Sequence, residues 1–500
     1  MTFRTMQLWG AAAIVALLPG FASANPPDDG TGSTGATAAA AAPATSGSAS
    51  GTAQQQGSTN SGGDDPQPPG GQVIVEKSPP PSSPLALKVG DAELLIGGFM
   101  DAAVISRDVN TGNGIGTSFG TIPFGNTFQG NLPETKFSAQ NSRLTLQATT
   151  KVGGADVKGY LEVDFLGNAP NGLNVTSNSN TLRMRLYWVQ YRNNKFEFLA
   201  GQSWSMMTPN RNGLSPMPGD IFYSQDYDTN YQMGLTWART TGFRFILHGS
   251  DAVTAGVALE NPEQYVGTGV VLPAAFPAAE VDAGGVTTNV ANPYPDIIGK
   301  IALDPKTGST HQHFDAAVLF RGYKTYNPAS STTNTANGTG YEIGANLEPV
   351  HNFHFVATYF GSDGGGRYIA NTNLPDFIVN ADGSMTTVKS RSYIVGPEFA
   401  FGKSLIYFYY SEAHADQALA TDTNGKQIGF GTSGNNVANN KIIEPTIGLT
   451  QTFYRDPKYG GVQLMLQYSQ VKRTPFSVPA GTPTDAKANM FYINVRYVLP

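Results

Sequence analysis

Apolar and polar residues alternate along much of the chain after residue 84. In the stretch 182–188, the apolar residues share one parity: Leu182, Met184, Leu186 and Trp188. Arg183, Arg185 and Tyr187 share the other parity. Because successive side chains of a strand point to opposite faces, this pattern predicts a strand with one apolar and one polar face. The same alternation recurs at 143–149, 157–165, 314–320, 341–347, 353–359 and 462–468.

The connections between these runs are alternately short and long. Short turns are predicted at 153–154, 193–194, 240–242, 304–309, 349–352, 402–403 and 456–460. Long polar loops are predicted near 108–135, 167–180, 204–230, 251–296, 327–339, 361–390, 414–440 and 471–487. This regularity is typical of a transmembrane β-barrel, with periplasmic turns at one end and extracellular loops at the other.

A closed barrel accounts for both patterns. Backbone groups inside a lipid bilayer must pair with one another, and a sheet that closes on itself leaves no unpaired edge. We therefore predict an all-β protein, a transmembrane antiparallel β-barrel of about sixteen strands over residues 85–500. We expect it in the bacterial outer membrane with both chain ends periplasmic. The outer face of such a barrel is apolar, which assigns the apolar parity of 182–188 to lipid and the two arginines to the lumen.

The chain ends in a run of the same kind. Its apolar parity consists of Phe491, Ile493, Val495, Tyr497 and Leu499. Bacterial outer-membrane proteins typically end in such a strand, so we expect the outer-membrane assembly machinery as a partner. The last two residues here are Leu499 and Pro500, whereas the usual last residue is aromatic.

The N-terminal region is of a different composition. Arg4 precedes an apolar run, 8–18, and the small residues 22–24 follow, which predicts a signal peptide over 1–24. Residues 25–84 are rich in Gly, Ala, Ser and Pro and nearly devoid of large apolar side chains, so we predict a disordered periplasmic segment. A cell-wall contact or an O-glycosylated tract is the alternative for this segment.

Composition and motifs argue against catalysis. The net charge of −6 shows no basic footprint for nucleic acid, and the absence of cysteine excludes disulfides and thiolate sites. The hydrolase motifs Gly-x-Ser-x-Gly and His-Glu-x-x-His are absent, and His311 and His313 lack a third nearby ligand. We therefore predict no enzyme, with no catalytic residue, metal or cofactor. An outer-membrane hydrolase with a nucleophile–histidine pair stays as a minor alternative.

One part of the chain resembles a known family. The segments 141–146, 158–165, 182–187 and 201–205 carry a Ser-Arg-Leu strand, a Gly-x-x-Glu-x-Asp-Phe strand, an Arg-x-Arg strand and a Gly-Gln-x-Trp turn. In this order they resemble the DcaP-like outer-membrane porins. The resemblance implies a trimeric porin of sixteen strands that favours small anionic solutes, dicarboxylates among them. Members of that family can carry a helical periplasmic segment, whereas residues 25–84 here are Gly/Ala/Ser/Pro-rich.

Charged residues on the lumen parity are the candidates for pore lining. They are Arg143, Lys158, Glu162, Asp164, Arg183, Arg185, Arg244, Arg321 and Arg496, together with Arg211 in a loop. Rings of arginine and lysine favour anions, and the guanidinium fork suits carboxylates. The alternative is that the acids pair with the arginines across neighbouring strands and only stiffen the wall.

The loop 204–230 is the candidate constriction. It follows the fifth strand, the position at which general porins fold a loop into the lumen. Its candidate residues are Trp204, Met206, Met207 and Arg211, and Pro216, Met217 and Pro218 would stiffen it. The alternative is an extracellular cover loop.

These expectations favour an outer-membrane porin for passive diffusion of small hydrophilic, preferentially anionic solutes. The expected partners are outer-membrane lipid, the solutes themselves and, from the resemblance, two further copies of the chain in a homotrimer. The main alternative is a plugged barrel that acts as an adhesin or a cell-wall tether.

Overall fold

The structure is a computed structural model that describes residues 83–167, 181–217, 221–274, 276–283, 290, 292–308, 310–328 and 330–500. The predicted signal peptide and nearly all of the predicted periplasmic segment lie outside the described residues, as does Pro218. Four short 3-10 helices occur among the described residues: η1 (Phe119–Thr121), η2 (Gln129–Asn131), η3 (Ala278–Val281) and η4 (Gly366–Tyr368). No helix in the described part of the chain is long and apolar enough to span a bilayer.

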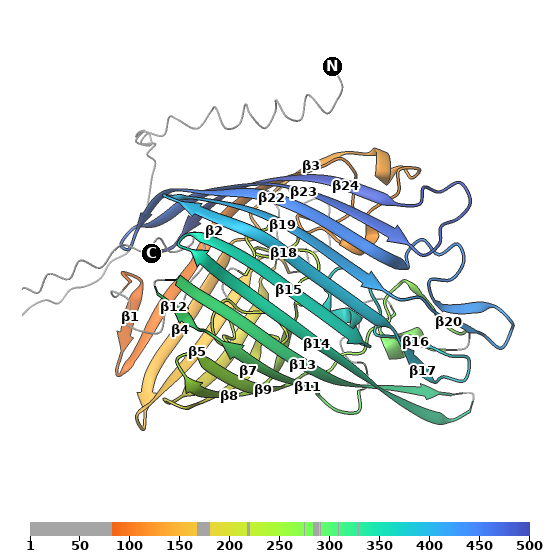
Figure 1. Cartoon of the computed structure of the whole chain (residues 1–500), viewed down its shortest axis with the longest axis horizontal. Coiled ribbons are helices and arrows are strands. Elements are labelled where there is room, and N and C mark those ends of the chain that lie inside the picture. Colours follow the sequence, from red (N-terminus) through yellow and green to blue (C-terminus); the bar gives the residue numbers. More distant parts are fainter. Residues whose placement is uncertain are drawn as a thin grey trace, which may run out of the picture. The chain divides into compact units, whose positions relative to one another are not determined.

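A closed antiparallel barrel dominates the structure (Figure 1). Its 16 strands are β2 (Ala92–Arg107), β4 (Arg143–Val152), β5 (Ala155–Asp164), β6 (Arg183–Arg192), β7 (Phe196–Trp204), β8 (Arg239–Ser250), β9 (Val253–Glu260), β11 (Asp296–Leu303), β13 (Thr310–Asn327), β14 (Thr332–Val350), β15 (Phe353–Asp363), β18 (Lys389–Phe401), β19 (Ser404–Ala415), β22 (Asn439–Asp456), β23 (Gly460–Pro475) and β24 (Ala486–Val498). The seam pairs β2 with β24, for example Phe99 with Val498. The predicted fold class is confirmed.

Short strands add to the barrel at its ends. The strand β3 (Glu134–Ser138) continues β4, because both pair with β2. The strands β1 (Ala86–Val89) and β12 (Lys306–Thr307) lie at one end of the barrel (Figure 1). At the other end are the strands of two small sheets: β10 (Val270–Val271), β20 (Ala418–Thr421) and β21 (Gln427–Phe430) in one, and β16 (Phe377–Val379) and β17 (Met385–Thr387) in the other.

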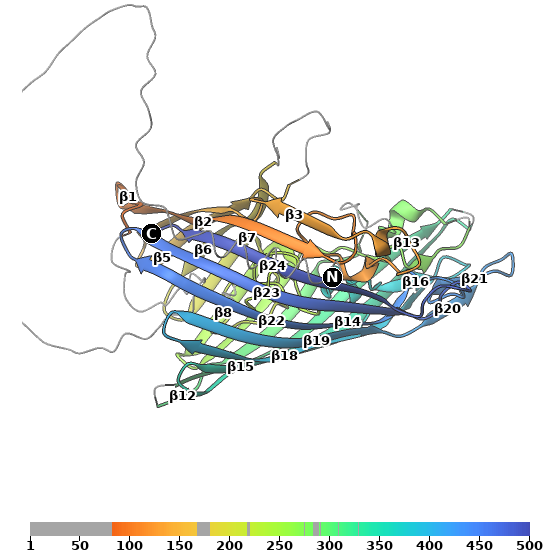
Figure 2. The ribbon, with the colours of Figure 1, turned by 90° about the horizontal axis from the view of Figure 1, so that it is seen from above.

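Most of the predicted turns and loops separate the observed strands. The short turns gather at the end of the barrel where β1 and the C-terminus lie, and the long loops gather at the opposite end (Figure 2). The predicted turn at 240–242 is wrong, because these residues lie within β8. The true turn follows Ser250, and β9 occupies the first part of the predicted loop 251–296. The predicted loop 327–339 is also too long, since β13 and β14 extend to Asn327 and Thr332.

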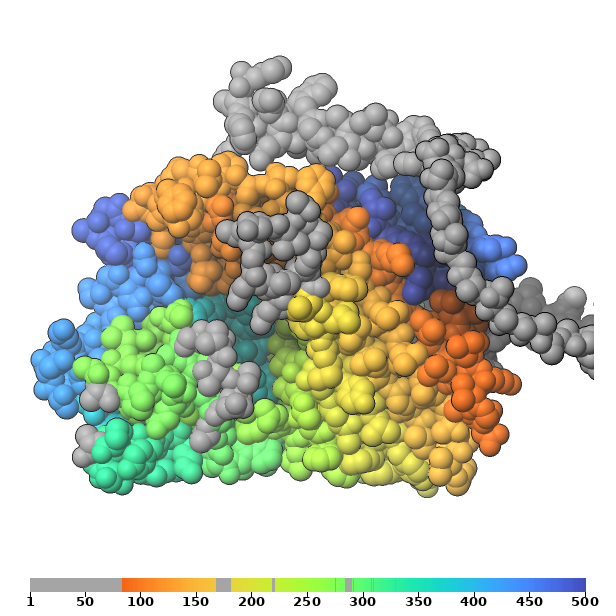
Figure 3. Space-filling model, turned by 180° about the vertical axis from the view of Figure 1, so that it is seen from behind, coloured from red at the N-terminus to blue at the C-terminus, as the bar shows by residue number. Residues whose placement is uncertain are grey.

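The outer face of the barrel is apolar. Exposed large side chains on β6 and β8 include Tyr187, Val189, Phe243, Phe245 and Leu247. Figure 3 shows the side of the barrel from the orange residues of β2 to the yellow-green residues of β9 as a closely packed surface. Alternate residues of the same strands, such as Glu162 and Asp164 of β5, are buried inside the barrel.

A β-bulge at Arg185 reverses the parity of β6 partway along the strand. Glu162 of β5 pairs with Leu186 and the next residue, Val163, pairs with Met184, so Arg185 is the extra residue. Leu186 and Trp188 are therefore 1% and 4% exposed, whereas Tyr187 is 60% exposed. The prediction that Leu186 and Trp188 face lipid is wrong, because the bulge turns both side chains into the barrel. Leu182 and Met184 lie before the bulge and are exposed as predicted.

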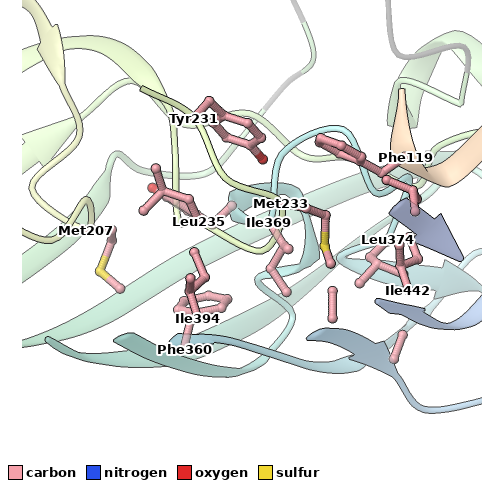
Figure 4. Packing of buried hydrophobic residues seen from close by; sticks show 14 of the residues in the cluster. Phe119, Met207, Tyr231, Met233, Leu235, Phe360, Ile369, Leu374, Ile394 and Ile442 are labelled. Carbon is pink, nitrogen blue, oxygen red and sulfur yellow. The ribbon is translucent and has the colours of Figure 1, made fainter. Parts of the chain in front are cut away.

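Loops that fold inward bring a large apolar cluster into the barrel. In Figure 4, Met207, Tyr231, Met233 and Leu235 of the loop between β7 and β8 lie over Phe360, Ile394 and Ile442 of the wall. Ile369 and Leu374, from the loop between β15 and β18, join them. The interior thus has an apolar core of its own, which fixes the inward loops against the wall.

Candidate functional site

The loop 205–238, between β7 and β8, reaches across the lumen to the opposite wall. Arg211 donates two hydrogen bonds to the carboxylate of Glu398 on β18, at 2.9 and 2.6 Å. The Lys300 ammonium of β11 donates to the carbonyl of Thr208 at 2.8 Å. Because β18 lies several strands away from β8 around the barrel, the contact with Glu398 holds the loop inside the barrel rather than over its mouth.

The charge of Arg211 is matched by the wall. Burial alone would lower the pKa of this guanidinium, but Glu398 outweighs that effect and raises the pKa above its usual value. The Arg211 guanidinium also lies 5.2 Å from the ring centre of Tyr223. Arg211 therefore anchors the loop to the opposite wall.

The other candidate constriction residues have different surroundings. Met206 and Met207 are buried in the apolar cluster, so they stabilise the loop rather than line an open passage. Trp204, the last residue of β7, is partly buried beside Tyr160 and Trp188, whose rings stack at 5.2 Å. Met217 packs against the same group.

Three carboxylates surround Arg183 and Arg185 of β6. Arg183 donates to both oxygens of Asp164, at 3.0 and 2.6 Å. Arg185 donates to Glu162 at 2.5 Å and to Asp164 at 2.8 Å. Asp228, from the loop 205–238, accepts from Arg183 at 3.2 Å and from Arg185 at 2.6 Å. The structure thus brings together four of the predicted residues and adds one acid from a loop.

Asp228 is the centre of this cluster and was not predicted from the sequence. Its second carboxylate oxygen lies 3.5 Å from Arg143, which also approaches Glu162 at 3.5 Å. Burial would raise the pKa of Asp228, but the charges of Arg185, Arg143, Arg239 and Arg183 outweigh it and hold the pKa well below the usual aspartate range. Asp228 is therefore ionised and ties the loop to the β4–β6 wall.

Access to water differs among these arginines. The side chain of Arg185 is 1% exposed, that of Arg143 is 14% exposed and that of Arg183 is 25% exposed. Arg143 and Arg183 are therefore the more accessible of these three arginines, whereas Arg185 is sealed among its carboxylates.

The remaining predicted residues form no ion pair with this cluster, although Arg496 borders it through Thr229 and the ring of Phe99. Arg496 pairs with Asp101 at 2.9 Å, and Arg321 pairs with Asp296 at 3.1 Å and with Asp376 at 2.8 Å. Arg244 is buried, and one of its terminal nitrogens has no hydrogen-bond partner among the described residues. Lys158 is partly exposed on β5 and does have a partner.

Arg239 belongs to the cluster but was missed. It is the first residue of β8, next to the incorrectly predicted turn at 240–242, and it pairs in register with Trp204. Its guanidinium lies 5.6 Å from the ring centre of Trp204 and 5.1 Å from that of Trp237. Trp237 and Arg239 are only two residues apart in the sequence, but only the path of the loop brings Trp237 beside Trp204.

The described residues hold no group of three or more His, Asp or Glu side chains that fits a metal ion. What the cluster offers is a set of N–H donors and positive charge beside aromatic rings. Such a surface binds or steers anions without any covalent chemistry.

The arrangement of strands is similar to that of solved outer-membrane channels. The match to the outer membrane channel DcaP of Acinetobacter baumannii covers 82% of this chain and 99% of that chain, with a TM-score of 0.58 and 17% sequence identity. The chain shares the DcaP fold. The resemblance noted in the sequence is thus confirmed for the fold.

Other solved structures are more distant. OmpF of Salmonella typhi, in complex with daunomycin, matches with a TM-score of 0.44 and 11% identity over 83% of this chain and 99% of that chain. OprB of Pseudomonas putida matches with a TM-score of 0.44 and 10% identity over 81% and 94%. No protein-family model and no curated protein sequence matches the chain.

Proposed function

We propose that the chain is a diffusion channel of the bacterial outer membrane for small hydrophilic solutes, with a preference for anions. The observation that carries this proposal is the charge of the cluster on β4–β8. Four arginines, Arg143, Arg183, Arg185 and Arg239, meet three carboxylates, Glu162, Asp164 and Asp228. One positive charge is left over in the cluster.

This excess acts locally. The mature chain is acidic as a whole, but charges interact strongly only at short range when salt screens them. In a narrow, partly dehydrated passage, the nearby arginines therefore dominate over acids on the outer loops. Dicarboxylates are the solute class we favour among anions, because separate guanidinium groups can hold the two ends of one molecule. We also propose a homotrimer.

Planar bilayers test the channel directly. The purified protein is expected to give single-channel conductance. In a KCl gradient, the sign of the reversal potential is expected to show that chloride is more permeant than potassium. Uptake of a dicarboxylate by liposomes that contain the protein should exceed uptake of a neutral sugar of similar size. Conductance with a preference for potassium would contradict the anionic part of the proposal alone.

A plugged barrel is the second candidate. It is favoured by the inward loops, whose apolar cluster fills much of the interior, and by arginines such as Arg185 and Arg321 that are almost fully buried. Protein that folds and inserts but never conducts, also after the salt and voltage are varied, would support this candidate and reject the channel.

A further inference from the structure

Arg239 differs from the other arginines of the cluster in what surrounds it. Aromatic rings from two sources, Trp204 of the wall and Trp237 of the loop 205–238, lie within 6 Å of its guanidinium, as given above. The two ring centres are only 4.8 Å apart. Ring faces attract a guanidinium and replace part of the water that it loses on burial. The wall and the loop thus hold this charge in place without an acid.

No acid neutralises Arg239 directly. Among the residues that the structure describes, no carboxylate oxygen lies within 4.0 Å of it, and its Nη1 is buried without a hydrogen-bond partner. Arg183 and Arg185, by contrast, each contact two or three carboxylates. The uncompensated charge of the cluster therefore resides mainly on Arg239.

The position of Arg239 places this charge at the passage. The ring of Trp204 is shared with Arg185, whose guanidinium lies 5.8 Å from the ring centre. Trp237 places Arg239 against the same loop that carries Asp228. Arg239 as a whole is only partly buried, although its Nη1 is buried.

We propose that Arg239 binds permeating anions and that it, rather than Arg183 or Arg185, determines the anion preference of the channel. This inference rests on the proposed function. Ring faces interact with the plane of a guanidinium and leave its edge free, and the edge carries the N–H groups that bind a carboxylate or a halide. Arg183 and Arg185 have already committed these edges to Asp164, Glu162 and Asp228.

Reversal potentials in a KCl gradient test the assignment, with chloride as the probe. Arg239→Gln is expected to lower the ratio of chloride to potassium permeability roughly fivefold, the effect of one unit charge at close range in a hydrated passage. Arg183→Gln should lower it less. Arg391→Gln removes a charge from an exposed position on the outer parity of β18 and should change nothing.

Arg239→Lys separates the charge from mere packing. Lysine keeps the positive charge, so the permeability ratio should stay close to that of the unaltered protein even though the planar stacking is lost. Heat-modifiable migration in gels confirms for each variant that the barrel has folded.

The outcomes distinguish this inference from the proposed function. If the unaltered channel prefers anions and folded Arg239→Gln prefers them equally, or if Arg183→Gln has the larger effect, the assignment to Arg239 is wrong while the channel stands. If the unaltered protein does not conduct, the proposed function fails and the assignment fails with it.

Discussion

The two walls that face each other across the loop 205–238 carry opposite excesses of charge. On β4–β8, Arg143, Arg183, Arg185 and Arg239 outnumber Glu162 and Asp164. On β11–β18, Asp315, Glu342 and Glu398 outnumber Lys300. The loop presents Asp228 to the first wall and Arg211 to the second. Charge complementarity therefore fixes which side of the loop faces which wall.

The two walls also differ in access. Lys300, Asp315 and Glu398 are buried, and the backbone N–H of Asn210 caps Asp315 at 2.9 Å, so the loop seals the acid-rich wall. Arg143 and Arg183 keep part of their side chains in water. If the chain is a channel as proposed, the cation-rich wall is the one that solutes meet, because the loop covers the acid-rich wall.

Arg211→Ala should have the largest effect. It leaves Glu398 buried without its partner, and breaking a buried ion pair from one side costs about 3 to 5 kcal/mol. We expect a lower midpoint of urea unfolding in detergent and, because the loop detaches from the acid-rich wall, a higher conductance. Asn346→Ala is the control, since it removes only a 3.4 Å contact to Arg211. Equal midpoints for both variants would show that the loop does not depend on this wall.

Asp228→Asn acts on the other wall. Charge-assisted hydrogen bonds to Arg183 and Arg185 are weakened, at a cost of about 2 kcal/mol, and the cluster gains a positive charge. The anion preference should therefore rise while stability falls. Because the pKa of Asp228 is lowered on folding, its stabilising contribution is present above the usual aspartate range and is lost only as the pH falls through the lowered pKa. Reversal potentials that move toward potassium would contradict the comparison.

Asp226→Asn tests an acid that forms no ion pair with either wall among the described residues. Burial raises the pKa of Asp226 to about 7, and one of its oxygens has no hydrogen-bond partner among the described residues. A raised carboxyl pKa contributes stability that is full at low pH and is lost as the pH rises through about 7. Between pH 6 and pH 8 the unaltered protein should therefore lose about 1 kcal/mol of stability relative to the variant. Thermal midpoints of both proteins at pH 6 and pH 8 measure this difference. For Asp228→Asn, the difference from the unaltered protein should be the same at both pH values.

The smallest effect is expected at the turn end of the barrel. Lys151 and Asp156 form an ion pair at 3.2 Å, but their side chains are 78% and 68% exposed. Exposed pairs are worth less than about 1 kcal/mol. Lys151→Ala should leave the urea midpoint and the selectivity unchanged. If Lys151→Ala lowered the urea midpoint as much as Arg211→Ala, burial would not explain why ion pairs in the lumen stabilise the protein more than exposed pairs.

The barrel could be predicted from the sequence because the alternation of apolar and polar residues has a physical cause on every strand. Lipid outside the barrel and water inside it favour apolar and polar side chains at alternate positions, and β5 keeps this alternation from Val157 to Asp164. The prediction from alternation fails where a β-bulge adds a residue to the strand. At Arg185 a single extra residue reverses the faces, and nothing in the alternation of 182–188 distinguishes a bulge from a regular strand.

Only part of the candidate site could be predicted from the alternation of residues. Residues on regular strands, such as Glu162 and Arg183, could be assigned to the lumen from parity alone. Asp228 and Trp237 could not, because they lie in a loop without periodicity whose path depends on contacts with Glu398 and Lys300 far along the chain. Arg239 was hidden by a Thr-Thr-Gly stretch that reads as a turn but continues a strand.

The seam between β2 and β24 has a consequence for biosynthesis. Every other pair of neighbouring barrel strands consists of strands adjacent in synthesis and can form as soon as both exist. Phe99 waits for Val498, which lies about 400 residues further along the chain. Until then the first strand keeps an open edge that could pair with any other chain. The chain must therefore be kept apart from its neighbours until β24 is available, and a chain that lacks only β24 would be left with two open edges instead of none.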